Sequence, residues 1–122
     1  MRYEVTEADT ATALGSGDVP VLGTPRMIAW MEAATVRAAA PLLAAGQTTV
    51  GVAIRVEHLR ATPVGGTVDV TAEAPDGASG RRLTFAVRAV DGAGTVVAAG
   101  EIDRAIVDRD RFTEAAGRPP GT

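Results

Sequence analysis

The sequence of 122 residues contains no cysteine, no lysine, one histidine and four aromatic residues. Without cysteine there is no disulfide framework and no thiolate site for zinc or an iron–sulfur cluster. Without lysine there is no side-chain amine for a Schiff base and no P-loop lysine. Four aromatic rings are too few for a base-stacking surface, and a net charge of −3 argues against a basic nucleic-acid face.

Long apolar segments are also missing. No run approaches the roughly 18 apolar residues that span a membrane, and the first five residues lack the apolar stretch of a signal peptide. A lone histidine cannot form a histidine metal cluster, and the carboxylates show no metal-ligand spacing. We therefore expect a cytoplasmic protein with no membrane or nucleic-acid partner, no metal and no bound cofactor.

The length suits one domain, which we expect over residues 1–112, followed by a disordered Pro/Gly-rich tail over 113–122. The clearest element is a helix over about 25–44, with Thr24 as N-cap and Pro25 in the first helical position. Pro41 should kink or end its regular part near Ala40. Its apolar face recurs at three- and four-residue spacing, at Ile28, Met31, Thr35, Ala38 and Leu42.

Most of the remaining chain has the alternating pattern of β-strands, over residues 2–8, 48–60, 67–74, 81–90 and 95–107. Residues 9–18 are small and polar and are expected to form a loop, and Gly-rich turns separate the later strands. Antiparallel strands packed on one long helix predict an α+β domain. In the second strand the pattern places on one face Val50, Val52, Ile54, Val56 and His58.

Three side chains stand out as candidates for chemistry. Thr24 suits an N-cap, and its hydroxyl beside helix N–H groups also suits a developing oxyanion or a positioned water. Glu32 lies at the border of the apolar stripe, where it either reaches water as a boundary residue or has a partner or a chemical role. His58 is either a hydrogen-bonded core residue or a functional one.

The helix start from Thr24 to Ala34 resembles the central helix of hot-dog-fold thioesterases, and most closely the fluoroacetyl-CoA thioesterase-like family. Four further segments resemble the same family in the same order: 46–51, 56–65, 80–85 and 101–108. The resemblance extends over residues 19–112. It implies a hot-dog fold, in which a curved antiparallel sheet of about five strands wraps one long central helix, assembled as a homodimer.

The resemblance also implies hydrolysis of an acyl-CoA or acyl-carrier thioester, with coenzyme A entering only as part of the substrate. The family's catalytic residues fall on Thr24, Glu32 and His58, with Glu32 as general base or nucleophile, and a glycine lining the site falls on Gly51. The residues that we expect to contact substrate are Gly51, Arg26, Met27 and Arg104. The aromatic gate of the fluoroacetate-specific member is absent from residues 15–18, which favours a different or broader acyl group.

Two other functions remain open from the sequence: a non-catalytic acyl-thioester binding protein, and a hot-dog hydratase or dehydratase. Helix geometry adds a constraint, because Thr24 and Glu32 are separated by about 12 Å along the helix and by about 80° around it. They cannot touch within one straight helix. Either His58 and the substrate bridge them, or residues of two chains meet in one site.

Overall fold

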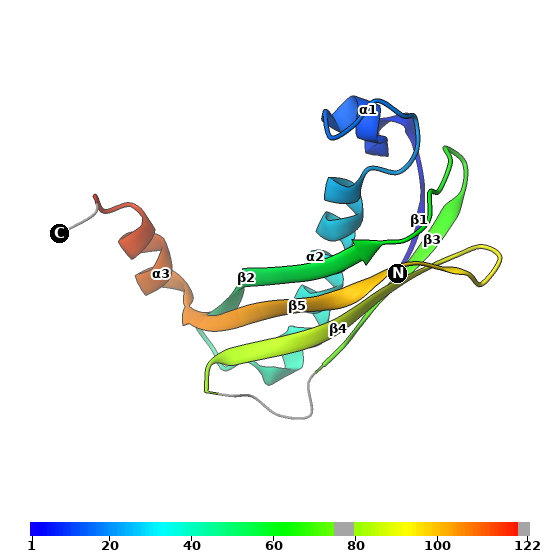
Figure 1. Ribbon diagram of the computed structural model, residues 1–122. Helices are drawn as coiled ribbons and strands as arrows, with labels where there is room; N and C mark the ends of the chain where they lie inside the picture. The colour runs from blue at the N-terminus through cyan, green and yellow to red at the C-terminus, as the bar shows by residue number, and fades with distance from the viewer. Residues whose placement is uncertain (75–79, 120–122) are drawn as a thin grey trace.

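The computed structural model describes residues 1–74 and 80–119 (Figure 1). A short strand β1 (Arg2–Glu4) leads through a 3₁₀ turn η1 (Glu7–Asp9) and helix α1 (Ala11–Leu14) to the long helix α2 (Thr24–Ala39). A second 3₁₀ turn η2 (Ala40–Leu42) precedes the remaining elements, which are β2 (Gln47–His58), β3 (Thr67–Glu73), β4 (Arg82–Asp91), β5 (Val96–Asp108) and α3 (Arg109–Ala116).

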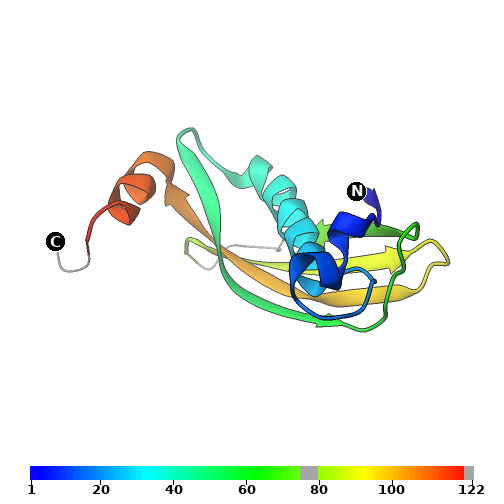
Figure 2. The same cartoon turned by 90° about the horizontal axis from the view of Figure 1, so that it is seen from above.

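All five strands form one antiparallel sheet in the order β1-β3-β4-β5-β2. The sheet curls around α2, which crosses its concave face (Figure 2). In β4 every second residue points to the helix, so that Leu83, Phe85, Val87 and Ala89 are buried while their neighbours are exposed. The predicted α+β architecture and the alternation of this strand are therefore confirmed.

Helix α2 is anchored to the sheet by its apolar face. Met27 and Met31 are completely buried, and each contributes about 1.5–3 kcal/mol relative to an exposed side chain. The helix ends at Ala39 and continues as the 3₁₀ turn that contains Pro41, because proline cannot extend the α-helical hydrogen-bond ladder. The predicted end near Ala40 is confirmed.

Strand β2 departs from the expected simple alternation. Its register against β5 shifts between Gly51 and Ala53, so that one extra residue, Val52, is accommodated in a bulge. Gly51 is paired with Arg104 before the bulge, and Ile54 is paired with Ile102 after it. The prediction that Val50 shares a face with Ile54 and His58 is therefore wrong, because a bulge reverses the alternation of the preceding residues.

Two segments that were expected to be irregular are helical. Within residues 9–18, α1 begins after Thr10, whose hydroxyl accepts a hydrogen bond from the Ala13 amide. At the other end, α3 covers part of the predicted disordered tail, and the Asp108 side chain caps it by accepting from the Arg111 amide. Side-chain capping of this kind satisfies helix N–H groups that would otherwise lack partners. Residues 120–122 of the predicted tail lie outside the described residues.

Candidate active site

The first part of the site joins the start of α2 to the end of β2. Thr24 is the first residue of α2, and Gly23 occupies the N-cap position. The Oγ1 atom of Thr24 lies 2.8 Å from Nδ1 of His58. The Thr24 hydroxyl is thus hydrogen-bonded to an imidazole, and the prediction that it caps the helix is wrong. A hydroxyl within hydrogen-bond reach of an imidazole is an arrangement that hydrolases use.

His58 is half-buried and points to the concave side of the sheet, since it is paired with the fully buried Ala98. Burial lowers the pKa of His58 from its ordinary value of 6.5, and a backbone hydrogen bond to Arg60 opposes this shift. The imidazole is therefore neutral at neutral pH. Its second nitrogen, Nε2, is buried and has no hydrogen-bond partner among the described residues.

The second part of the site is centred on Glu32, farther along α2. The Glu32 carboxylate accepts a hydrogen bond of 3.3 Å from Nη1 of Arg104, a residue of β5. The Arg104 side chain is only 8% exposed, and Thr49 of β2 holds its other nitrogens. Nε donates to Oγ1 of Thr49 at 2.8 Å, and Nη2 donates to its carbonyl at 3.1 Å. A buried, immobilised guanidinium therefore orients the carboxylate.

Gly51 allows the Glu32 carboxylate to approach the backbone of β2. A Cβ atom at position 51 would lie 2.9 Å from Oε2 of Glu32 and 3.5 Å from Nη1 of Arg104. Beside the carboxylate is an open hollow of about 410 Å³, which is lined by Glu32, Gly51, Val52, Ala53 and Ile54. One carboxylate in an otherwise apolar wall is an arrangement suited to an apolar acyl group next to a reacting water.

The two parts of the site remain separate within one chain. Thr24 and Glu32 both lie on α2, so they are separated by about 12 Å along the axis and about 80° around it. The side-chain hydrogen bonds described for Glu32 and for His58 run to different residues, Arg104 and Thr24. One chain therefore presents two half-sites: Thr24 with His58, and Glu32 with Gly51 and Arg104.

Two of the residues expected to contact substrate, Met27 and Arg26, instead pack against or pair with other parts of the protein. Met27 is completely buried in the hydrophobic core, so its side chain packs the fold and offers no accessible surface to a substrate. Arg26 is partly buried, and its Nε lies 2.9 Å from a carboxylate oxygen of Asp9. This ion pair fastens the start of α2 to η1, close to the Thr24–His58 half-site.

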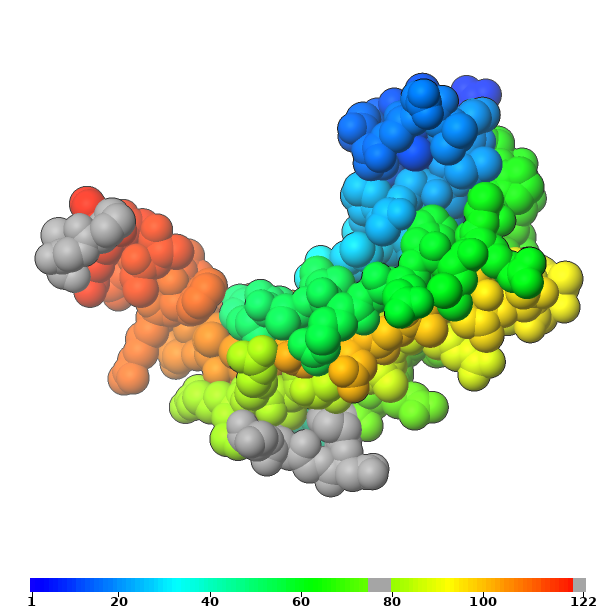
Figure 3. Space-filling view, in the orientation of Figure 1, coloured from blue at the N-terminus to red at the C-terminus, as the bar shows by residue number. Residues whose placement is uncertain are grey.

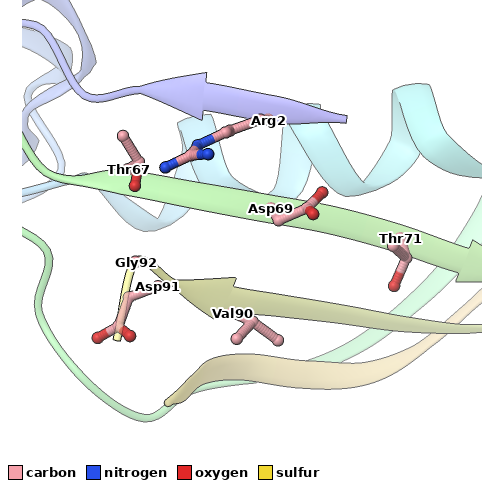
Figure 4. Close-up of a pocket in the computed structure, with 7 residues that line it drawn as sticks. All are labelled: Arg2, Thr67, Asp69, Thr71, Val90, Asp91 and Gly92. Atoms are coloured by element: carbon pink, nitrogen blue, oxygen red, sulfur yellow. The ribbon is translucent and has the colours of Figure 1, made fainter. Parts of the chain in front are cut away.

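Other features of the described residues do not suggest a competing site. A hollow of about 350 Å³ lies at the far edge of the sheet, between β1, β3 and β4 (Figure 4). It contains none of the predicted site residues, and its Asp69 forms an ion pair with the amino group of Met1.

Within residues 1–74 and 80–119 no cluster of three or more potential metal ligands occurs. No helix in the same ranges is long and apolar enough to cross a membrane.

A long helix wrapped by a curled five-stranded antiparallel sheet is the hot-dog fold, the class expected from the resemblance of the sequence. The family model described as fluoroacetyl-CoA-specific thioesterase (FlK) matches residues 5–110. This chain belongs to that family.

Individual relatives agree with this assignment. The fluoroacetyl-CoA thioesterase of Streptantibioticus cattleyicolor is 44% identical over 92 residues, which are 75% of this chain and 65% of that protein. A solved structure of the fluoroacetyl-CoA thioesterase FlK has a TM-score of 0.87 at 35% identity, covering 98% of this chain and 93% of that one. A thioesterase superfamily member from Thermus thermophilus has a TM-score of 0.86 at 25% identity, covering 95% and 85%.

The sequence did not reveal the part played by Thr49. It is 8% exposed and provides two of the three protein groups that hold Arg104. A polar residue within an apolar strand was the available signal, but the bulge beyond Gly51 concealed that Thr49 shares the inner face with Arg104. Periodicity alone cannot locate a bulge.

Proposed function

We propose that this protein is an enzyme that hydrolyses acyl-CoA thioesters to a carboxylic acid and free coenzyme A. The observation that carries the proposal is the Glu32 carboxylate, held by Arg104 against Gly51 at the edge of an apolar hollow. A binding protein has no need for a carboxylate that faces an apolar acyl site. The proteins that this chain resembles are named as thioesterases that act on a coenzyme A ester.

In the proposed reaction, water attacks the thioester carbonyl while Glu32 removes its proton, and the carbon–sulfur bond then breaks. The departing thiolate takes up a proton, which leaves a carboxylate and a thiol. Alternatively, Glu32 attacks the carbonyl itself, and water then hydrolyses the mixed anhydride. In either case we assign to His58 the transfer of a proton to the leaving group or the orientation of the Glu32 carboxylate. We assign to Thr24 the positioning of the reacting atoms. General acid–base catalysis of this kind contributes about 10²–10⁴ in rate.

We further propose that the working enzyme is a homodimer in which Glu32 of one chain meets Thr24 and His58 of the other. The separation of the two half-sites on α2 supports this arrangement. So does β2, an edge strand of the sheet whose Val52 and Ile54 are 47% and 43% exposed. An exposed apolar edge strand pairs readily with a second copy.

The substrate is proposed to carry a small acyl group without a requirement for fluorine, since residues 15–18 contain no aromatic side chain and so lack the gate that the resemblance implies for the fluoroacetate-specific member. Gly51 and Arg104 are proposed to shape the acyl end of the site, and Arg26 its mouth. A cytoplasmic location is part of the proposal, in keeping with a chain that has no cysteine for disulfides.

Thiol release from a panel of short, branched and aromatic acyl-CoAs tests the activity. We expect turnover by the wild type, a loss of about 10²-fold or more in Glu32→Gln, and unchanged turnover in Glu57→Gln. Glu57 is an exposed glutamate of the same strand as His58 and serves as the matched control. Full activity of Glu32→Gln would overturn the mechanism, and no release from any CoA ester would favour carrier-bound substrates or a binding protein.

Mixing two inactive variants tests the shared site. If Glu32 and His58 of different chains cooperate, a dimer of one Glu32→Ala and one His58→Ala chain has one intact site. Random reassociation of equal amounts should then restore about a quarter of the wild-type activity. A mixture that forms mixed dimers but remains inactive would show that both groups act within one chain.

A further inference from the structure

Six of the nine exposed large hydrophobic side chains among the described residues lie along strand β2 or next to its ends. Val52 and Ile54 lie in the middle of β2, Leu59 and Val64 lie beyond its carboxyl end, and Leu42 and Phe112 lie at its other end. All six are between 43% and 55% exposed. An apolar line that follows a free sheet edge from end to end indicates a protein interface.

Two helical segments stand at opposite ends of this line. Helix α3 follows β5 next to the start of β2, where the amide of Arg109 donates to the carbonyl of Gly46. Helix α1 stands at the other end, where its Ala11 and Leu14 pack next to Gly23 at the start of α2. Figure 1 shows that both helices project beyond the β2 edge of the sheet. The surface between them is hollowed, with β2 along its floor (Figure 3). Because β2 has 12 residues, its ends are separated by about 40 Å.

Helix α3 is poorly covered by its own chain. None of its residues is buried, and Phe112 is 45% exposed. The guanidinium groups of Arg109 and Arg111 form no ion pair with any residue in the part of the chain that the structure describes. An eight-residue helix has little stability of its own, and therefore usually needs packing partners.

The charge of the opposite segment complements these arginines. Residues 7–18, which contain η1 and α1, carry three acidic side chains and no basic one: Glu7, Asp9 and Asp18. Asp9 is engaged by Arg26, whereas Glu7 and Asp18 are exposed. Within one chain the distance along β2 keeps α3 away from this acidic segment.

A second copy of the chain can bring α3 next to an acidic segment that its own chain keeps at a distance. A two-fold axis through the middle of β2 pairs the strand antiparallel with its copy and exchanges its two ends. The same operation brings α3 of one chain beside α1 of the other. We propose that each α3 docks on residues 7–18 and 59–64 of the partner chain, and that its Phe112 forms a wall of the partner's half-site at Thr24 and His58. The proposal rests on the homodimer described under Proposed function.

Phe112 is then a specificity-determining residue that acts across the dimer. An aromatic ring over the Thr24–His58 half-site limits the width of the channel through which the thioester enters. The width of the acyl site is thereby coupled to dimer formation.

Photo-cross-linking tests the docking. The chain has no cysteine, so Phe112→Cys in the full-length protein carries a single site for a benzophenone maleimide. An equal mixture of isotopically labelled and unlabelled chains is irradiated, digested with trypsin and examined by mass spectrometry. We expect cross-links from residue 112 of one chain to the peptide 3–26 or 61–81 of the other. Thr113→Cys, whose side chain points about 100° away around α3, is the control and should give fewer.

A dimer in which residue 112 cross-links only within its own chain would overturn the proposal. A monomeric protein would overturn it together with the proposed homodimer. Neither result depends on hydrolysis, so a failure of the docking proposal is distinguishable from a failure of the proposed activity.

Kinetics then test the effect on specificity. We expect Phe112→Ala to narrow the difference in kcat/KM between short and bulky acyl-CoAs by about tenfold, in the range of a lost aromatic contact. Thr113→Ala should preserve the wild-type preference. An unchanged preference in Phe112→Ala, with the cross-link to the partner in place, would show that α3 serves assembly only and would overturn the assignment of Phe112 to specificity.

Discussion

Thr24 and Glu32 lie on the same helix, yet their side chains are engaged by residues at opposite ends of the site. Thr24 is hydrogen-bonded to His58 at the end of β2, whereas Glu32 is held by Arg104 next to Gly51, before the bulge. The bulge in β2 makes this possible, because it turns both Gly51 and His58 toward α2 although their positions differ by seven, an odd number. A regular strand would direct one of them to the outer face.

Gly51→Ala should disable the Glu32 half-site while the fold is retained. The added Cβ atom would lie 2.9 Å from Oε2 of Glu32, so the carboxylate must move away from Arg104. We expect kcat to fall about tenfold or more, since small misplacements of a catalytic group are costly. Gly92→Ala is the matched control, because its Cβ would meet Oγ1 of Thr67 at 3.1 Å in a turn remote from Glu32. Thioesterase assays and thermal melting compare the two; equal kcat values would argue against close packing at Gly51.

Arg104 should act as a positioning residue for Glu32. Arg104→Met removes the hydrogen bonds to Glu32 and to both Thr49 groups, and we expect a loss of about 1–3 kcal/mol of stability, less than for a fully buried pair because Glu32 is partly exposed. Arg104→Lys retains the positive charge, but an ammonium group cannot reproduce the planar arrangement of hydrogen bonds to Glu32 and to both Thr49 groups. It should therefore lower kcat with little change in KM. Urea denaturation and steady-state kinetics provide the two readouts, and a change in KM alone would show that Arg104 shapes the acyl end of the site without positioning Glu32.

The elements that follow local rules could be predicted from the sequence. Pro25, the apolar spacing and Pro41 together predict helix α2. The regular alternation around Phe85 predicts strand β4. Glu32 and His58 could be selected because each is a polar side chain at or beside an apolar face. Thr24 could be selected because its hydroxyl lies at the expected start of the helix. Their pairing could not be predicted, because Thr24 and His58 meet only through the way β2 curls around α2.

Other features depend on tertiary contacts that leave no local pattern. The bulge at Val52 is absent from the alternation of the sequence, and it is the reason that Val50 was placed on the wrong face. The burial of Met27 was equally hidden, since it follows Thr24 closely in sequence but lies on the core face of the helix. Helix α3 was missed because Pro and Gly after residue 116 outweighed the capping signal of Asp108.

The single histidine makes the protonation of the site directly observable. Burial lowers the pKa of His58 below 6.5, so the folded protein binds a proton less readily than the unfolded chain. The contribution of the neutral ring to the free energy of unfolding is fully present above pH 6.5. This contribution decreases as the pH falls from 6.5 through the folded-state pKa of His58. The same group should set the acid limb of kcat/KM. NMR titration of its ring protons needs no assignment among several histidines; a pKa of 6.5 or higher would contradict the burial argument.

Asp103, on the outer face of the sheet, should control stability in acid. Its side chain is 6% exposed, and it accepts hydrogen bonds from Arg55, Arg82 and Thr84. The bonds from Arg55, followed by those from Arg82, hold the pKa of this carboxyl below its ordinary value of 3.8. Because the folded state binds this proton less readily, the stabilisation is present above pH 3.8 and is lost as the pH falls through the folded-state pKa.

Asp103→Asn therefore has a distinctive expected signature. At pH 7 it should lower the free energy of unfolding by about 2–3 kcal/mol, because two guanidinium groups lose their shared anion. The difference between wild type and variant should begin to shrink as the pH falls below 3.8, since the unfolded wild-type chain then binds a proton that the folded state takes up only at lower pH. Asp69→Asn is the control, as its side chain is 61% exposed and, among the described residues, pairs only with the amino terminus. Urea denaturation at pH 7 and at pH 3 measures both variants, and a pH-independent difference for Asp103→Asn would show that its bonds do not depend on its charge.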